Sequence, residues 1–183
     1  MTDPGPDAAT TTDDAARVVS AIREYARAAE LECEDGTRDG ELVLTLPGER
    51  KLKTVTSLMV GEDRLSVRAF VVRNPDENHA EVYRYLLRRN LRLPGLAYAI
   101  DRSGDVFLTG QVPLAGIDED YLDHLFGAVL TACDEPFNEL LVLGFLTSMR
   151  REWAWRVDRG ESTANLEAFR HLLENPPDAP APS

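Results

Sequence analysis

Apolar and polar residues recur with two different periods along this chain, and the changes of period predict where its helices and strands lie. The first stretch with helical spacing runs from Thr11 to about Leu31. Its apolar positions are Val18, Val19, Ile22, Tyr25, Ala26 and Ala29. Residues 32 to 72 then alternate with period two in three or four short segments, which predicts strands. Because the links between them are short, we expect antiparallel pairing.

The next stretch predicts a helix followed by a hairpin. Residues 74–77 read Asn-Pro-Asp-Glu, a strong helix start in which Asn74 is the cap, and the helix should end near Asn90. Residues 96–100 and 106–112 alternate as strands. Between them, residues 101–104 read Asp-Arg-Ser-Gly, which is typical of a hairpin turn because Gly104 accepts a positive φ.

The remainder of the chain predicts three more helices. Asp118 is placed to cap the first, with Ile117 and Leu122 spaced as a hydrophobic staple, and residues 135–136 (Glu-Pro) break it. A second helix should span about 137–157, and a short last one should start at residue 162 or 163.

These elements predict an α+β fold, a two-layer sandwich in which an antiparallel sheet packs against helices. The expected order is α-β(3-4)-α-β-β-α, followed by C-terminal helices. We expect disordered tails at 1–10 and 175–183, an α+β domain at 11–134, and a helical extension of the same domain at 135–174.

The helix at 137–157 is apolar nearly all round, so it must be covered from more than one direction. The two indoles of Trp153 and Trp155 lie roughly 200° apart on it, and one sheet cannot bury both. The last helix, a second protomer or a client peptide could cover the second side. The candidate binding or dimer surface is Leu140, Leu143, Leu146, Trp153 and Trp155.

Charge narrows the set of partners. The chain has 183 residues and a formal charge of −12, from 32 acidic and 20 basic residues. Such a field repels nucleic acid and anionic lipid, so we expect neither partner. The main basic cluster is Arg88, Arg89 and Arg92; balancing the acidic surface is its simplest role, and an anion or RNA site is the alternative.

Cysteine content and hydropathy indicate the compartment. Cys33 and Cys133 do not form a disulfide framework, and each is expected to pack as a small hydrophobe. The first residues lack the features of a signal peptide, and the longest apolar run, residues 140–143, is far too short to span a bilayer. We therefore expect a cytoplasmic protein.

Candidate chemistry is sparse, and we predict no catalytic residue, no metal site and no cofactor. His79, His124 and His171 lie on three different predicted helices, and Asp120 with His124 is best interpreted as a surface salt bridge. The acidic residues at 101–105 lack the twelve-residue calcium pattern. Neither a nucleophile motif nor a glycine-rich phosphate loop is present.

Several spaced segments resemble the YbjN domain family. They are residues 81–90 (EVYRYLLRRN), 97–101 (AYAID), 104–108 (GDVFL) and 111–114 (QVPL) with the acidic-capped helix that follows. The resemblance covers roughly residues 13–133. The family is described as sensory-transduction-regulator-like, and its fold is similar to that of type III secretion chaperones, small dimeric proteins that hold extended peptide segments.

This resemblance implies a non-catalytic, chaperone-like or regulatory module that binds a protein or peptide client and forms a homodimer. The alternative is an enzyme or small-molecule sensor with a pocket between sheet and helices. An exposed apolar groove or an open strand edge would favour the first hypothesis. A concave pocket with converging ionisable groups would favour the second.

Overall fold

The structure is a computed structural model that describes residues 6–174. Its elements are α1 (Pro6–Ala28), β1 (Glu32–Asp35), β2 (Glu41–Pro47), β3 (Lys53–Val60), β4 (Arg64–Val72), α2 (His79–Asn90), β5 (Leu96–Ile100), β6 (Val106–Pro113), α3 (Glu119–Asp134), α4 (Phe137–Arg159), the 3₁₀ helix η1 (Ala164–Phe169) and α5 (Arg170–Glu174). Within these residues, no helix is long and apolar enough to cross a membrane.

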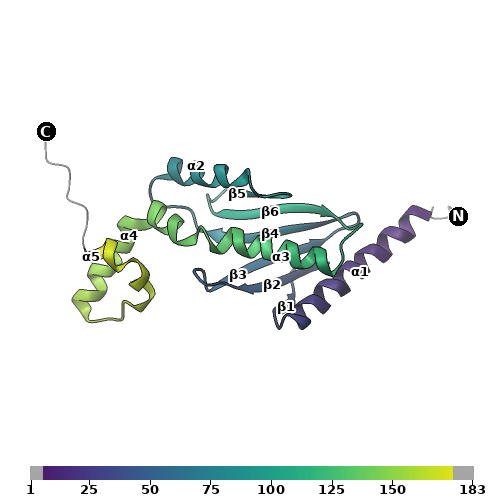
Figure 1. Ribbon diagram of the computed structural model, residues 1–183, viewed down its shortest axis with the longest axis horizontal. Helices are drawn as coiled ribbons and strands as arrows, with labels where there is room; N and C mark the ends of the chain where they lie inside the picture. The colour runs from purple at the N-terminus through teal and green to yellow at the C-terminus, as the bar shows by residue number, and fades with distance from the viewer. Residues whose placement is uncertain (1–5, 175–183) are drawn as a thin grey trace.

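All six strands form one antiparallel sheet in the order β1-β2-β3-β4-β6-β5. Figure 1 shows α1 and α3 lying across one face of this sheet, and both helices contact its strands. Helix α2 lies beside the outermost strand β5, and α4 continues from α3 beyond the end of the sheet, where η1 and α5 fold against it. The predicted α+β fold, with an antiparallel sheet packed on helices, is confirmed.

Strand alternation divides the sheet into a covered face and an open face. The covered face carries fully buried side chains such as Leu44, Leu58, Leu65 and Leu108. The open face runs across the strands through Val43, Ser57, Arg68, Thr109 and Ala97, which are half-buried or exposed. The apolar period of two therefore reflects a sheet with helices on one side only.

Two local signals of the sequence act as predicted. The side chain of Asp118 accepts a hydrogen bond from the Tyr121 N–H at 2.8 Å and caps α3, next to the buried Ile117 and Leu122. In the hairpin, Gly104 has φ +84° and its N–H donates to the Asp101 carbonyl at 3.0 Å. The Asp101 carboxylate also accepts the Ser103 and Asp105 N–H groups, so it serves the turn.

The predicted start of α2 at Asn74 is wrong. The helix begins at His79, after Asn78, which has a left-handed conformation with φ +53° and makes no side-chain cap. The Asn74 N–H instead donates to Asp105 Oδ1 at 2.7 Å, and the Asn74 side chain packs against Gly104 of the hairpin. Asn74 is suited by its local sequence to cap a helix, but tertiary hydrogen bonds hold it against the hairpin instead.

The residues after Asn74 bind α4 rather than starting α2. The N–H groups of Asp76 and Glu77 both donate to the Gly144 carbonyl, at 2.9 and 3.2 Å. The Glu77 carboxylate accepts from the N–H and the hydroxyl of Thr147, both at 2.7 Å. A Cβ on Gly144 would lie 3.0 Å from Pro75, so the glycine permits this close approach.

Helix boundaries elsewhere differ by a few residues. Helix α1 begins at Pro6 instead of Thr11, so residues 6–10 are helical and not a disordered tail. Helix α4 ends at Arg159, two residues after the expected position. The last helix begins as a 3₁₀ turn at Ala164. Residues 1–5 and 175–183, where tails were expected, lie outside the described residues.

The hydrogen bonds of Asp76, in the segment before α2, should make the stability of the protein sensitive to acid. Asp76 accepts hydrogen bonds from Arg73 at 2.7 Å and from Ser148 at 2.7 Å, and these hold the pKa of its carboxyl at about 2, below the ordinary 3.8. Because the folded-state pKa is lowered, this carboxylate stabilises the protein above pH 3.8 and loses its contribution as the pH falls towards 2.

We therefore expect Asp76→Asn to lower the free energy of unfolding by about 1 kcal/mol at pH 6, the loss of a partly exposed charge-assisted hydrogen bond. The difference from the unsubstituted protein should shrink at pH 3. Urea denaturation at both pH values measures it. The control is Asp39→Asn in an exposed turn, and an equal loss in both variants would contradict the assignment.

Candidate functional site

Metal-ligating side chains are not brought together. Among the described residues, no group of three or more His, Cys, Asp or Glu side chains is close enough to hold a metal ion. His124 Nδ1 lies 2.6 Å from the backbone carbonyl of Asp120, so the salt bridge predicted between these side chains is not the interaction formed.

The two cysteines lack the setting of a nucleophile. Cys133 is fully buried, and burial raises the pKa of its thiol to about 12. Cys33 is half-buried on the covered face of β1, and burial raises its pKa as well. A reactive cysteine needs the opposite shift, because the thiolate is the nucleophile. Both cysteines therefore serve as packing residues.

Helix α2 presents an exposed apolar row to solvent. Tyr83, Leu87 and Leu91 are spaced four residues apart and so lie along one line of the helix. Leu87 is 64% exposed and Leu91 88% exposed. Between this row and β5 lies a hollow of about 270 Å³ that also contacts Ile100, itself 52% exposed. These side chains form the α2–β5 patch, defined by Tyr83, Leu87, Leu91 and Ile100.

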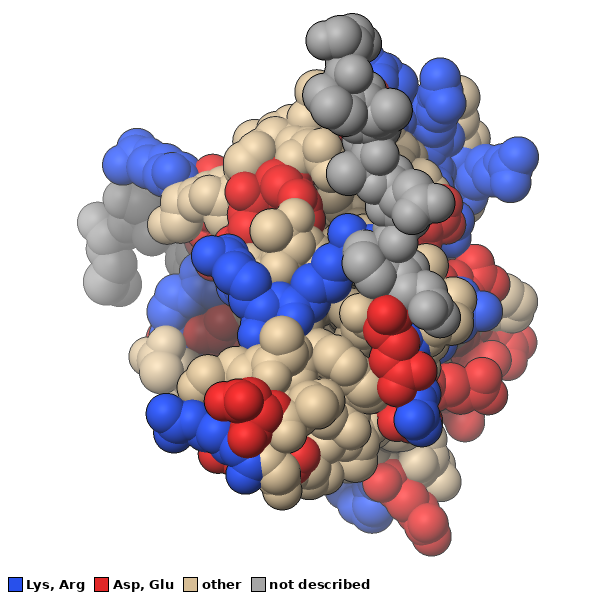
Figure 2. Space-filling view, turned by 90° about the vertical axis from the view of Figure 1, so that its left-hand side faces the viewer, with Lys and Arg blue, Asp and Glu red and all other residues tan. Residues whose placement is uncertain are grey.

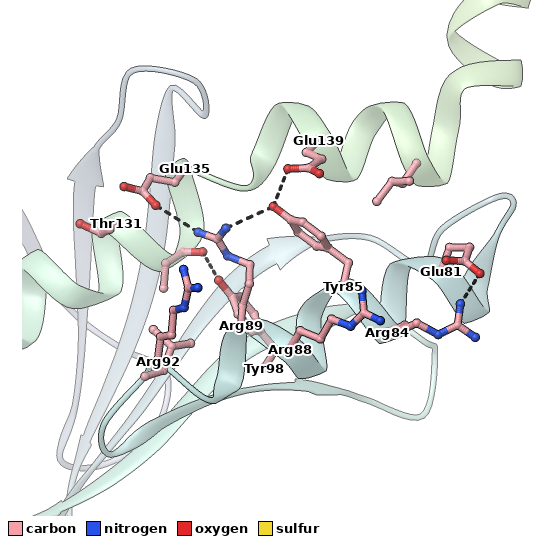
Figure 3. A pocket seen from close by; sticks show the side chains of 13 residues that line it. Glu81, Arg84, Tyr85, Arg88, Arg89, Arg92, Tyr98, Thr131, Glu135 and Glu139 are labelled. Atoms are coloured by element: carbon pink, nitrogen blue, oxygen red, sulfur yellow. Dashed lines mark hydrogen bonds and ion pairs between the residues drawn. The ribbon is translucent and has the colours of Figure 1, made fainter.

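A second row on α2 is basic. Arg84, Arg88 and Arg92 follow the apolar row at the same spacing, one position further along the helix. They line a cavity of about 600 Å³ between α2 and the junction of α3 with α4. Figure 3 shows the arginines spread along the helix, with Arg84 paired to Glu81. Among the described residues, no hydrogen bond or ion pair involves the side chains of Arg88 and Arg92.

The inner wall of this cavity is a closed network. Arg89 bridges Glu135 at 3.0 Å and the Tyr85 hydroxyl at 3.3 Å, and that hydroxyl donates to Glu139 at 2.8 Å (Figure 3). Burial and the bond to Glu139 raise the pKa of Tyr85 to about 12, so the phenol stays protonated. The Tyr98 hydroxyl donates to the Ala132 carbonyl at 2.6 Å. These groups bind α2 to α3 and α4.

Most ionisable side chains that line the cavity are paired with one another. Its tyrosines are held neutral, and its carboxylates at 135 and 139 are engaged by Arg89 and Tyr85. A general base or nucleophile needs a free group with a pKa near the working pH. The free cations of Arg88 and Arg92 point instead to an anionic partner.

The outer edge of β5 is blocked by a side chain of α2. Asn90 accepts a hydrogen bond from the Tyr98 N–H at 2.8 Å and donates to the Tyr98 carbonyl at 3.4 Å. The amide thus fills the two backbone positions that an added strand would use in the middle of β5. At the opposite edge, β1 has four residues and three of them are acidic. Short, charged or covered edges resist strand addition.

The open face of the sheet holds a second apolar group, and cations lie over it. The rings of Phe70 and Phe107 meet edge to face, with centroids 5.5 Å apart. The Arg68 guanidinium lies 3.8 Å from the centre of the Phe107 ring, and the Lys51 ammonium lies 5.2 Å from that of Phe70. These aromatic faces are therefore less available than the leucines of α2.

The residues predicted to form a surface on α4 are divided between core and solvent. Leu140 and Trp153 are buried within the chain, where they are unavailable to a partner, Leu143 and Leu146 are half-buried, and Trp155 is 47% exposed. The last turns supply part of the cover, because Leu166, Phe169 and Leu173 are all buried. Whether the remaining exposed part binds a partner stays a prediction.

The two rows of α2 are present in the sequence, but the apolar period alone does not separate them from the core. It places Tyr83 and Leu87 on the same apolar side as Val82 and Leu86, which are buried in the structure. A helix lying at the edge of a sheet has a narrower buried stripe than one lying across a face, so the outer apolar row remains exposed. The signal that could have separated them is the four-residue spacing shared by two adjacent rows.

Charge is also distributed more finely than the net value suggests. Figure 2 looks at the end of the molecule formed by α4 and α5, where basic side chains cross the middle of the view and acidic ones lie around them. This end is therefore a mixed surface and not a uniform acidic field.

Comparison with known proteins agrees with this fold. Residues 19–142 match the family model of the YbjN family, described as "Putative bacterial sensory transduction regulator". This chain belongs to the YbjN family. Two mycobacterial proteins are similar to this chain. "Uncharacterized protein Rv0487" of Mycobacterium tuberculosis is 56% identical over 131 residues, 72% of each chain. "Uncharacterized protein ML2442" of Mycobacterium leprae is 50% identical over 148 residues, 80% of each chain.

Among solved structures, a chain of the ExsC–ExsE complex has a TM-score of 0.53 with 20% identity, over 69% of this chain and 95% of that one. The Yersinia pestis type III secretion chaperone SycH, in complex with a fragment of YscM2, has a TM-score of 0.44 with 18% identity, over 68% and 97%. The expected membership of the YbjN family is thus confirmed, and the similarity to the ExsC–ExsE chain is a likeness of fold.

Proposed function

We propose that this chain is a non-catalytic, chaperone-like module that binds a segment of another protein. The observation that carries the proposal is the α2–β5 patch, whose leucines stand in solvent beside a sheet edge. Exposed apolar groups gathered in one place mark interaction surfaces. The likeness in fold to a chain of the ExsC–ExsE complex supports the proposal, because that structure is a complex of two proteins.

The patch is large enough to contribute to binding. Burying one exposed leucine side chain fully stabilises a complex by about 1.5–3 kcal/mol. Leu87 and Leu91 together would therefore supply about 3 kcal/mol or more, which is roughly a hundredfold in affinity. Because Asn90 occupies the edge of β5, the partner docks through side chains in the groove and not as an added strand.

A photo-reactive amino acid at position 87 tests this proposal in the native cell. We expect covalent capture of one protein partner at position 87, and none at position 52, where the control residue Leu52 is 84% exposed but lies in the β2–β3 link. With the partner purified, Leu91→Asp should weaken binding about tenfold or more. Equal capture at 52 and 87, or unchanged affinity in Leu91→Asp, would show that the patch is not the docking surface.

We also propose that the module forms a homodimer. It is supported by the apolar positions of α4 that the chain itself leaves partly uncovered, Leu143, Leu146 and Trp155. Most soluble oligomers are symmetric homo-oligomers, and a two-fold axis would use this apolar area twice.

Light scattering tests the homodimer. We expect twice the chain mass of 20.3 kDa at micromolar concentration, and we expect Leu143→Asp to give a folded monomer. Circular dichroism verifies that the variant is folded. A monomeric mass for the unsubstituted protein over the same concentrations would remove the dimer and leave client binding to be judged on its own.

The 600 Å³ cavity favours a second candidate function, a sensor of a small anionic molecule. A ligand at about 100 times its Kd stabilises a protein by ~2.7 kcal/mol, which raises the melting temperature of a chain this long by roughly 5–10 °C. On the primary proposal, thermal unfolding with citrate, glutamate and inorganic phosphate should show no such rise. A rise that is lost in Arg88→Gln would favour the sensor.

A further inference from the structure

The two rows of α2 lie side by side along the whole exposed length of the helix. Successive residues are about 100° apart around a helix axis, so the arginine row directly adjoins the apolar row. Both continue past the end of α2, because Leu91 keeps a helical conformation and the Arg92 N–H donates to the Arg89 carbonyl at 2.9 Å. A segment that lies on the leucines therefore has guanidinium groups along one flank.

Two of these guanidinium groups are available. Arg84 is paired with Glu81, and Arg89 is engaged by Glu135 and Tyr85. Arg88 and Arg92 are exposed, and among the side chains that the structure describes none forms an ion pair with either one. They stand one helical turn apart, a spacing at which like charges destabilise a helix. An anion placed between them would remove that repulsion and could bind each guanidinium through two hydrogen bonds.

We propose that the segment bound by α2 carries acidic side chains next to its apolar ones, and that Arg88 and Arg92 bind those carboxylates. This inference rests on the proposed function, since the apolar row must hold the segment in place. It adds the chemistry of the partner: leucine-like side chains facing Leu87 and Leu91, and aspartate or glutamate on the adjoining row.

A second copy of this chain fits the site less well. In an antiparallel two-fold pairing of two α2 helices through the apolar row, both arginine rows lie on the same side of the pair. Like charges then meet across the interface, where an acidic segment would meet opposite charge. RNA could use the same arginines, but it would leave Leu87 and Leu91 uncovered, and the chain carries a net charge of −12.

The net charge does not prevent an acidic partner from binding here. At physiological ionic strength, charges more than about 8 Å apart are largely screened. A docked carboxylate therefore interacts mainly with the two nearest guanidinium groups and only weakly with distant acids.

Three synthetic helical peptides test the inference. All carry the same leucine row, and the adjoining row is glutamate, glutamine or lysine. Fluorescence anisotropy with the full-length protein should show that the glutamate peptide binds about five- to tenfold more tightly than the glutamine peptide, the gain expected from two exposed charge pairs. The lysine peptide should bind more weakly still. Raising the salt concentration should reduce the difference between the glutamate and glutamine peptides.

Two double variants are compared. The test variant combines Arg88→Gln with Arg92→Gln, and the control variant combines Arg27→Gln with Arg102→Gln. Both remove two exposed positive charges, and the second pair lies on α1 and in the β5–β6 hairpin. Only the first should abolish the preference for glutamate. A fluorescent single-stranded RNA probe is measured in parallel, and RNA binding that depends on Arg88 and Arg92 would overturn the proposal.

The remaining outcomes separate this inference from the proposed function. If the glutamate and glutamine peptides bind equally, the acidic chemistry is wrong and apolar docking stands. If no peptide binds while position 87 still captures a protein partner, the inference is wrong and the proposed function stands. If the peptides fail and position 87 captures nothing, both are wrong. If position 87 captures a second copy of the chain, the patch is a dimer interface and the inference is wrong.

Discussion

The pairing of β4 with β6 determines which strand lies at the edge of the sheet and therefore where α2 and its exposed rows lie. The two strands are matched from Arg64 opposite Pro113 to Val72 opposite Val106, so β6 takes the place beside β4 and β5 is displaced to the edge. Helix α2 connects β4 to β5 and must therefore follow β5 outwards. With α1 and α3 covering the face of the sheet, α2 is left half in solvent, and its outer rows become the candidate site.

Much of the fold follows from local sequence, and the exceptions are instructive. Asp118 caps α3 because its partner, the Tyr121 N–H, is three residues away. Asn74 has equally good capping chemistry, yet its neighbours Asp76 and Glu77 find the Gly144 carbonyl about seventy residues later. A capping motif predicts a helix start only when no group distant in the sequence competes for the same backbone N–H donors. The order of strands in the sheet also depends on contacts between residues far apart in the sequence. The alternation of apolar and polar residues does not place β6 between β4 and β5.

The candidate site was less predictable than the fold, because exposure depends on how a helix meets the sheet. The surplus of apolar residues on α4 pointed to that helix, but η1 and α5 fold back and bury part of it, with Phe169 and Leu173 in the core. On α2 the surplus is smaller and remains uncovered. Arg88 and Arg92 were interpreted as charge balance. Their significance comes from position, since they border exposed leucines and the nearby acids are already engaged by other groups.

The amide of Asn90 determines whether further strands can join this sheet at β5. A sheet with one uncovered face and a free edge strand is a template to which further strands can add. By occupying the Tyr98 N–H and carbonyl, Asn90 ends the sheet chemically at its outermost strand. The docking surface proposed on α2 is thereby separate from the backbone edge at which strands could add, and each can change without altering the other.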